Sequence, residues 1–258
     1  MHLSALILGA ALAAGNAAAD PAPEPEKPVI VLVHGAFAES SSWEPVIEKL
    51  AKDGFTVVAA ANPLRGVASD AASVSTLVQS IKGPVVLVGH SYGGPVITEA
   101  ANGKANVKAL VYVAGFAPET GESSFSLSAK YPGSTLGDAL TAVPLPGGGQ
   151  DLYIQPARFR AQFAADVPAA KAATMAATQR PVTMAALQEP SGVASWKTLP
   201  SYMIYGSADR NIPAAAMKFM AERAHARKTV ELPGASHALM VSQPGAVATL
   251  IEEAAQAK

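Results

Sequence analysis

Apolar runs rich in β-branched residues alternate with segments of helical periodicity, and this alternation limits the possible folds more than any other feature. The apolar runs lie at 29–33, 55–61, 84–90 and 107–115. Between them, apolar residues recur three and four positions apart at 43–50, 68–81 and 93–102. Runs that are apolar on both faces are typical of parallel strands covered by helices on both sides. The pattern predicts βαβ units and a doubly wound, mostly parallel α/β sheet.

The alternation stops after the run that ends near Gly115 and resumes close to residue 200. The intervening stretch has turn-rich segments such as "PLPGGGQ" and helical segments such as "ARFRAQFAAD", but no strong strand run. Strands and helices then follow in turn, and the chain closes with the amphipathic segment 244–258. We therefore expect one folded domain at 29–258, with a small helical cap inserted at about 117–198.

The first 28 residues differ from the rest of the chain. An apolar run from Leu3 to about Ala14 precedes Ala17 and Ala19 in an A-x-A pattern. This predicts a secretory signal peptide at 1–19, and hence a periplasmic or secreted location, although no Lys or Arg precedes the apolar run. The run is too short to favour a membrane span. The segment "DPAPEPEKP" at 20–28 predicts a stiff, extended linker.

Charge and composition exclude several classes of function. The formal net charge is −1, which argues against nucleic acid or an anionic membrane surface as the main partner. The chain has no cysteine, so disulfides, thiolate catalysis and zinc–sulfur sites are excluded. Half of the residues are hydrophobic, enough for a sizeable core. Nothing in the sequence indicates an oligomeric state.

The segment "GHSYGG" places a serine in a glycine-rich turn between a predicted strand and a predicted helix. Its G-x-S-x-G pattern consists of Gly89, Ser91 and Gly93 with two intervening residues. Such a turn strains the backbone of its central residue and raises the hydroxyl above the sheet. Ser91 is therefore the candidate nucleophile. The backbone N–H groups of Tyr92 and of Ala36, in "VHGAF", are the candidate donors of an oxyanion hole.

A serine hydroxyl needs a general base, and five histidines are available. His2 lies in the predicted signal peptide, and His225 is interpreted as a surface residue. His34 and His90 lie in the glycine turns, where we expect them to hold loop geometry. His237 remains, between the last predicted strand and the last predicted helix, and is the candidate base.

Asp209 follows a late strand in "YGSADRNIP" and is the candidate acid, with capping of the next turn as an additional expected role. Glu119 and Glu122 are weaker alternatives. The order Ser91, Asp209, His237 is that of α/β-hydrolases and differs from the orders in chymotrypsin and subtilisin.

From Val29 onwards the chain resembles the α/β-hydrolase superfamily, and within it the group of plant methyl esterases of the salicylate-binding type, hydroxynitrile lyases and bacterial esterase-like members. The resemblance is carried by "VLVHGA" with Trp43, "VVLVGHSYGG", "ALVYVAGFAP" followed by "SSF", "DRNIP" and "GASHALM". It implies the same triad and the same oxyanion donors, with a helical cap over the site. Hydroxynitrile lyases of this group have a threonine and a lysine where Ala36 and Ala238 stand, which argues against cyanohydrin cleavage.

These observations predict a serine hydrolase that cleaves a small, largely uncharged ester through an acyl-enzyme, with no metal or organic cofactor. A lactone hydrolase, or a C–C bond hydrolase or lyase, on the same triad is an alternative, and so is a non-catalytic, ligand-binding role. The cap supplies residues that could line an apolar pocket, namely Phe125, Tyr131, Tyr153, Phe159, Phe163, Met175 and Met184. For any single one of them, packing of the cap onto the core is the simpler interpretation.

Overall fold

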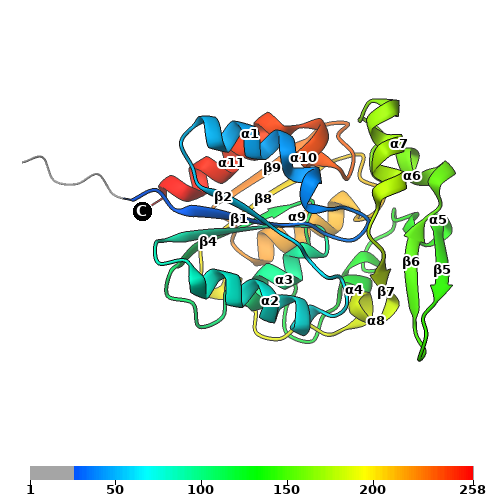
Figure 1. Cartoon of the computed structure of the whole chain (residues 1–258), viewed down its shortest axis with the longest axis horizontal. Helices are drawn as coiled ribbons and strands as arrows, with labels where there is room; N and C mark the ends of the chain where they lie inside the picture. Colours follow the sequence, from blue (N-terminus) through cyan, green and yellow to red (C-terminus); the bar gives the residue numbers. More distant parts are fainter. Residues whose placement is uncertain (1–25, 258) are drawn as a thin grey trace, which may run out of the picture.

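A six-stranded parallel sheet forms the centre of the computed structural model, which describes residues 26–257 (Figure 1). The strand order is β2-β1-β3-β4-β8-β9. The strands are β1 (Val29–Val33), β2 (Val57–Ala60), β3 (Val85–His90), β4 (Val107–Val113), β8 (Ser201–Gly206) and β9 (Lys228–Leu232). The chain winds outward from β1 in both directions, which confirms the predicted doubly wound sheet. The predicted signal peptide at 1–19 and residues 20–25 of the predicted linker lie outside the described residues.

Helices cover both faces of this sheet (Figure 1). One face carries α1 (Glu44–Lys52), α10 (Leu239–Ser242) and α11 (Pro244–Gln256), and the other carries α2 (Val67–Ser80), α3 (Gly93–Ala100) and α9 (Ala214–Arg223). A short 3₁₀ helix, η1 (Ser40–Trp43), leads into α1. Every residue of β3 and of β8 is buried, as expected for central strands with helices on both sides.

The cap lies between β4 and β8 and is only partly helical. Its helices are α4 (Ser124–Ser128), α5 (Leu136–Ala139), α6 (Pro156–Phe163), α7 (Ala169–Thr178) and α8 (Met184–Gln188), followed by the 3₁₀ helix η2 (Ser195–Lys197). It also contains a three-stranded antiparallel sheet of β5 (Leu140–Pro144), β6 (Gln150–Ile154) and β7 (Val182–Thr183). The cap that was expected to be helical therefore also contains a small sheet, which the sequence pattern does not indicate. Most of β5 is exposed and β7 has two residues, so neither produces a long apolar run.

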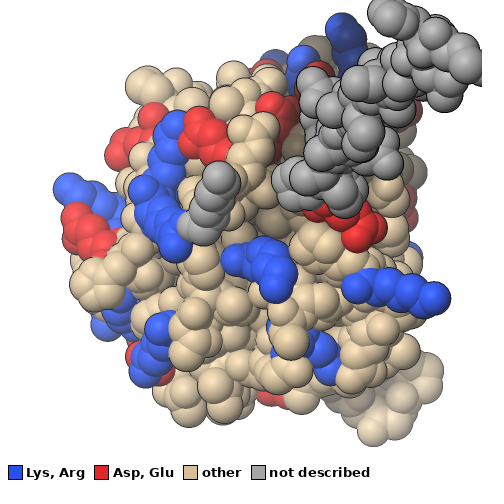
Figure 2. All heavy atoms as spheres, turned by 90° about the vertical axis from the view of Figure 1, so that its left-hand side faces the viewer, with Lys and Arg blue, Asp and Glu red and all other residues tan. Residues whose placement is uncertain are grey.

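The cap covers the edge of the sheet at which the parallel strands end (Figure 1). Ligands of open α/β sheets bind at this carboxyl edge, so the fold places the candidate site between the sheet and the cap. The opposite side of the molecule carries both acidic and basic side chains (Figure 2). Among residues 26–257, no helix is both long and apolar enough to cross a lipid bilayer.

Candidate active site

Ser91 occupies a tight turn between the end of β3 and the start of α3. Its φ angle is 53°, in the left-handed region that residues other than glycine rarely adopt. The turn is held from both sides, because the Ser91 carbonyl accepts from the N–H of Gly94 at 2.9 Å and of Phe116 at 3.2 Å. A strained residue fixed by its neighbours in this way is typical of functional sites.

The glycines of the G-x-S-x-G pattern are required by close approach of the backbone. A Cβ atom on Gly89 would lie 2.5 Å from the carbonyl oxygen of Gly93. A Cβ atom on Gly93 would lie 2.4 Å from the carbonyl oxygen of Val33, in the neighbouring strand. Any side chain at these positions would push the turn away from the sheet, so the glycines allow Ser91 to stand where it does.

His237 and Asp209 form a buried hydrogen-bonded pair. Nδ1 of His237 lies 2.6 Å from Oδ2 of Asp209, and both side chains are inaccessible to solvent. A carboxylate can only accept, so Nδ1 carries the proton and Nε2 of the neutral ring is the proton acceptor. Nε2 is buried and has no hydrogen-bond partner among the described residues. The ring is thus held in the tautomer that a general base requires.

Asp209 also caps its own turn, as the sequence predicted. Its Oδ1 accepts from the N–H of Asn211 at 2.7 Å and from the N–H of Ile212 at 3.0 Å. The carboxylate therefore has one oxygen fixed by backbone donors and the other on His237.

His90, the residue before Ser91, contacts the candidate base. Its Nε2 donates to the carbonyl oxygen of His237 at 3.1 Å, and the two ring centroids are 4.7 Å apart. Burial lowers the pKa of His90 well below its ordinary value, so its ring is neutral. These contacts fit the expectation that His90 holds loop geometry, because it fixes the backbone at His237.

His34 holds the other glycine turn. Its Nε2 accepts from the N–H of Asn62 at 3.1 Å, so the proton is on Nδ1, which donates to the Gly35 carbonyl at 3.0 Å. Burial lowers the pKa of His34 to about 4. The turn packs directly on the serine turn, since a Cβ atom on Gly35 would lie 3.0 Å from the backbone nitrogen of Tyr92.

The two candidate oxyanion donors, Ala36 and Tyr92, both line the cavity described below. Within the described part of the chain, neither backbone N–H donates to another protein group. The Tyr92 side chain points elsewhere, because its hydroxyl donates to Oδ2 of Asp70 at 3.0 Å inside the core. Burial raises the pKa of both Tyr92 and Asp70. The ring of Tyr92 therefore anchors the turn, and its N–H is the group available to a ligand.

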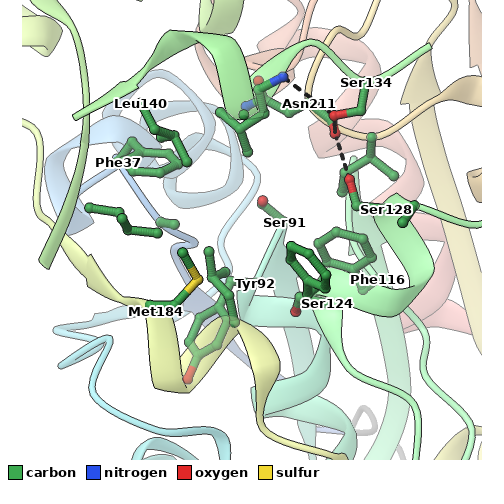
Figure 3. A pocket seen from close by; sticks show the side chains of 18 of the residues that line it. Phe37, Ser91, Tyr92, Phe116, Ser124, Ser128, Ser134, Leu140, Met184 and Asn211 are labelled. Carbon is green, nitrogen blue, oxygen red and sulfur yellow. Dashed lines mark hydrogen bonds between the residues drawn. The ribbon is translucent and has the colours of Figure 1, made fainter. Parts of the chain in front are cut away.

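A cavity of about 580 Å³ opens beside Ser91 (Figure 3). Among residues 26–257, no Asp, Glu, Lys, Arg or His lines it. The lining consists of Ala36, Phe37, Ser91, Tyr92, Phe116, Ser124, Phe125, Ser128, Ala129, Tyr131, Pro132, Gly133, Ser134, Leu136, Gly137, Leu140, Ala142, Gln150, Leu152, Met184, Leu187, Asn211 and Ile212. The volume and the mostly apolar wall are those of a small-molecule site.

Three of the seven cap residues named from the sequence line this cavity: Phe125, Tyr131 and Met184. The other four do not, namely Tyr153, Phe159, Phe163 and Met175. Phe159 and Phe163 are completely buried and pack on each other, with ring centroids 5.1 Å apart. The simpler interpretation, packing of the cap, is correct for these two.

The alternative acids lie in a separate ion-pair cluster. Glu122 pairs with Arg223 at 2.8 Å, and Glu119 pairs with Lys197 at 2.7 Å. Hydrogen bonds from Arg223 and from the Glu119 N–H lower the pKa of Glu122, although its partial burial acts in the opposite direction. Neither glutamate lines the cavity or contacts His237, so the structure gives no support to either as the acid.

The family model described as alpha/beta hydrolase family matches residues 30–250, which is most of the described chain. The chain belongs to the alpha/beta hydrolase family. This confirms the predicted superfamily and the predicted hydrolase class. Within residues 26–257, no cluster of three or more His, Asp or Glu side chains is arranged to hold a metal ion.

Esterases occur among the similar proteins. A carbendazim-hydrolyzing esterase from a Nocardioides species is 33% identical over 113 residues, which are 39% of this chain and 47% of that protein. The chain thus spans about half the length of that relative. Polyneuridine aldehyde esterase has the same fold, with a TM-score of 0.77 and 19% identity over 88% of this chain and 99% of that one. The methylesterase MES16 from Arabidopsis follows at a TM-score of 0.73 and 17% identity, covering 88% and 98% of the two chains. These matches agree with the predicted likeness to plant methyl esterases.

Some contacts of this candidate site could not be found from the sequence. Gln162 and Phe163, on α6 of the cap, contact the loops that carry Asp209 and His237. Neither residue belongs to a motif, and their spacing from the candidate triad has no periodicity. The role of these two residues can be seen only from their contacts in the folded chain.

Proposed function

We propose that this chain is a serine esterase in which Ser91 is the nucleophile, His237 the base and Asp209 the acid. The observation that carries the proposal is the buried His237–Asp209 hydrogen bond of 2.6 Å, which leaves Nε2 of His237 without a partner in the described structure. The loop of His237 contacts His90, the residue next to Ser91, and Ser91 lies on the wall of the cavity.

In this mechanism, Nε2 of His237 takes the proton of the Ser91 hydroxyl as its oxygen attacks the ester carbonyl. Asp209 stabilises the imidazolium that results. The N–H groups of Ala36 and Tyr92 hold the negative oxygen of the tetrahedral intermediate. His237 then donates its proton to the departing alcohol. Water, activated by the same histidine, releases the acid from Ser91.

The wall of the cavity supports a substrate without formal charge. A charged group transferred into an apolar site without a partner loses its hydration and gains nothing in return. A neutral, largely apolar ester suffers no such loss. The esterases among the similar proteins point to the same bond type, whereas lactones and β-diketones remain the alternatives for the same residues.

The test is covalent labelling with a fluorophosphonate probe, followed by peptide mapping. We expect the label on Ser91, and we expect Ser91→Ala to remain unlabelled and to lose hydrolysis of short p-nitrophenyl esters. A control variant, Ser195→Ala, removes a buried serine that hydrogen-bonds the Thr98 carbonyl and lies outside the cavity. It should keep both label and activity. Undiminished ester hydrolysis by Ser91→Ala would refute the assignment.

A substrate panel separates the remaining alternatives. It compares matched esters, lactones and β-diketones, together with one ester that carries a carboxylate on its acyl chain. We expect turnover of the neutral esters and a large loss for the charged one. Turnover confined to lactones or β-diketones would redirect the assignment to those bonds, and no turnover together with no labelling would indicate a binding protein.

We also propose that the protein is exported, on the basis of the signal-like segment at 1–19. N-terminal sequencing of exported protein should find Asp20 or a neighbouring residue as the first residue. Full-length protein retained inside the cell would contradict this.

A further inference from the structure

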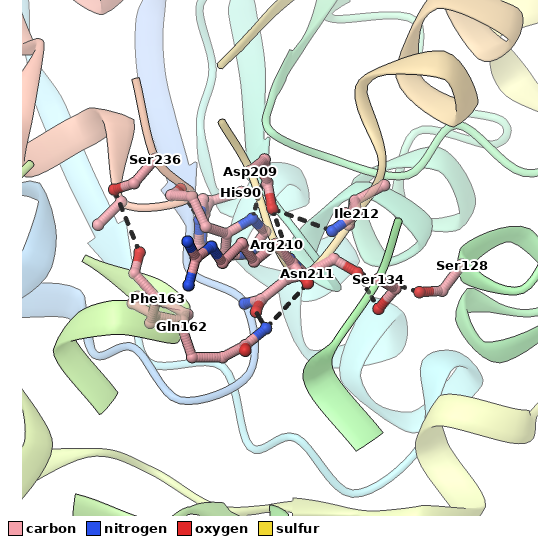
Figure 4. Close-up of polar contacts among 12 residues, drawn as sticks. His90, Ser128, Ser134, Gln162, Phe163, Asp209, Arg210, Asn211, Ile212 and Ser236 are labelled. Carbon is pink, nitrogen blue, oxygen red and sulfur yellow. Dashed lines mark hydrogen bonds and ion pairs between the residues drawn. The ribbon is translucent and has the colours of Figure 1, made fainter. Parts of the chain in front are cut away.

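The loop that follows Asp209 is hydrogen-bonded to the cap, and these hydrogen bonds are made to Arg210 and Asn211. The Gln162 side chain, on α6, donates from Nε2 to the Arg210 carbonyl at 2.8 Å and to Oδ1 of Asn211 at 2.8 Å (Figure 4). The backbone N–H of Thr135 donates to the same Arg210 carbonyl at 3.0 Å. One cap side chain therefore holds both residues that come directly after the candidate acid.

Two more cap residues hold the next carbonyl. The hydroxyls of Ser128 and Ser134 donate to the backbone oxygen of Asn211 at 3.1 Å and 2.9 Å (Figures 3 and 4). The N–H of Asn211 in turn donates to Oδ1 of Asp209. Asn211 thus links the cap to the Asp209 carboxylate, so a shift of the cap would also move this carboxylate.

The residue after Gln162 contacts the candidate base. The Phe163 ring meets the His237 ring nearly edge to face, with centroids 5.0 Å apart. The Phe163 carbonyl accepts from the hydroxyl of Ser236 at 3.4 Å (Figure 4). The same hydroxyl also hydrogen-bonds Asp166. Consecutive residues of α6 therefore touch the acid loop and the base loop.

We propose that Gln162 is a positioning residue that sets the geometry of the Asp209–His237 pair. The proposal rests on the proposed function for the meaning of that pair. Gln162 is buried, and its amide is fully engaged, since its Oε1 accepts from the Thr135 hydroxyl at 2.9 Å. The cap therefore has a second role besides lining the cavity, because it also holds Asp209 in position to hydrogen-bond His237. Small misplacement of such a group is enough to slow catalysis strongly.

Gln162→Met removes all three hydrogen bonds and keeps the size and apolar stem of the side chain. The chain offers a matched control in Gln179. Its amide also makes three hydrogen bonds, to the N–H and carbonyl of Ile154 and to the carbonyl of Ala176, and all three stay within the cap. Gln179→Met therefore reproduces the loss of bonds and the local destabilisation without touching the acid loop.

The first readout is steady-state kinetics on the best ester of the panel. We expect Gln162→Met to lower kcat by roughly tenfold to a hundredfold with KM near that of the parent, and Gln179→Met to leave both near the parent values. Equal kcat in the two variants would overturn the proposal. Thr135→Val removes only the hydrogen bond that orients the Gln162 amide, so it should also lower kcat, but by a smaller factor. This variant replaces Gln162→Met as the test if Gln162→Met does not fold.

The second readout does not depend on activity. A short N–H···O bond to a carboxylate strongly deshields its proton, so the bond between His237 and Asp209 should give a far-downfield proton resonance that disappears in Asp209→Ala. We expect this resonance to move upfield in Gln162→Met and to stay in place in Gln179→Met. An unmoved resonance in Gln162→Met would refute the positioning role even in a chain that hydrolyses no ester. Failure of the proposed function is recognised separately, by an unlabelled Ser91.

Discussion

Nδ1 of His237 lies 2.6 Å from Oδ2 of Asp209 in a place that solvent does not reach. Short hydrogen bonds to an ionised partner are about twice as strong as neutral ones, and low dielectric increases their strength further. The bond fixes which nitrogen of the His237 ring can act as a base.

Asp209→Asn tests this bond. The amide can donate to Nδ1 and so favours the wrong ring tautomer, and we expect kcat to fall by about three to four orders of magnitude with the fold retained. Ester turnover and the rate of fluorophosphonate labelling measure the effect. Glu122→Gln is the control, since it alters the alternative acid and its pair with Arg223. If Glu122→Gln lost activity and Asp209→Asn stayed fully active, Glu122 and not Asp209 would be the acid of the triad.

Gly93→Ala tests the close packing beneath Ser91. The added methyl group would lie 2.4 Å from the Val33 carbonyl, so the turn must shift, and we expect a loss of about 2 kcal/mol or more in unfolding free energy together with most of the activity. Urea unfolding measures the first effect. Gly245→Ala, near the start of α11, meets no atom closer than 4.0 Å and should be neutral or slightly stabilising.

Tyr92→Phe separates the two parts of Tyr92. The variant removes the hydroxyl that hydrogen-bonds buried Asp70 and leaves the backbone N–H in place. We expect the unfolding free energy to fall by about 1–3 kcal/mol while kcat stays near the parent value. A large loss of kcat in a stable Tyr92→Phe protein would show that the ring takes part in the reaction.

His34 gives the stability of the fold a defined pH dependence. Its pKa is about 4 in the folded protein against 6.5 for the free side chain. Between these values the unfolded chain binds a proton that the folded chain does not, so the stabilisation is complete above about pH 6.5 and declines as the pH falls towards 4. His90 acts in the same direction.

We expect the His34 contribution to lower the unfolding free energy by about 2 kcal/mol between pH 7 and pH 5. Urea unfolding at both pH values should therefore show a smaller decline in His34→Gln than in the parent. Equal declines would mean that His34 is protonated in the folded state, or remains neutral in both states.

The sequence was sufficient to predict the sheet and to name the candidate triad. Val29–Val33 and Val85–His90 form strands whose two faces are both largely buried. Ser91, Asp209 and His237 follow different strands, β3, β8 and β9, which all end at the same edge of the sheet. Among the described residues, no hydrogen bond joins the Ser91 hydroxyl to Nε2 of His237. His237 and Asp209 come together as expected, over a separation of 28 residues.

The cap was harder to predict, because its structure depends on contacts that produce no periodic hydrophobic pattern in the sequence. β5 has mostly exposed positions, and among the described strands it pairs only with β6, so its strand character comes from a neighbour and not from a buried face. Phe159 and Phe163 are aromatic residues of the cap, as Phe125 is, yet only Phe125 lines the cavity. The direction in which α6 faces decides this, and that direction is set by the packing of the whole cap.

The described lining of the cavity, which has no Asp, Glu, Lys, Arg or His, also affects how the product leaves. Ester hydrolysis turns a neutral molecule into an alcohol and an acid that loses its proton near neutral pH. The new anion meets no cation on the cavity wall and gains its hydration only outside. Under the proposed function, the carboxylate product should therefore bind more weakly than the neutral ester, and we expect little inhibition of the enzyme by this product.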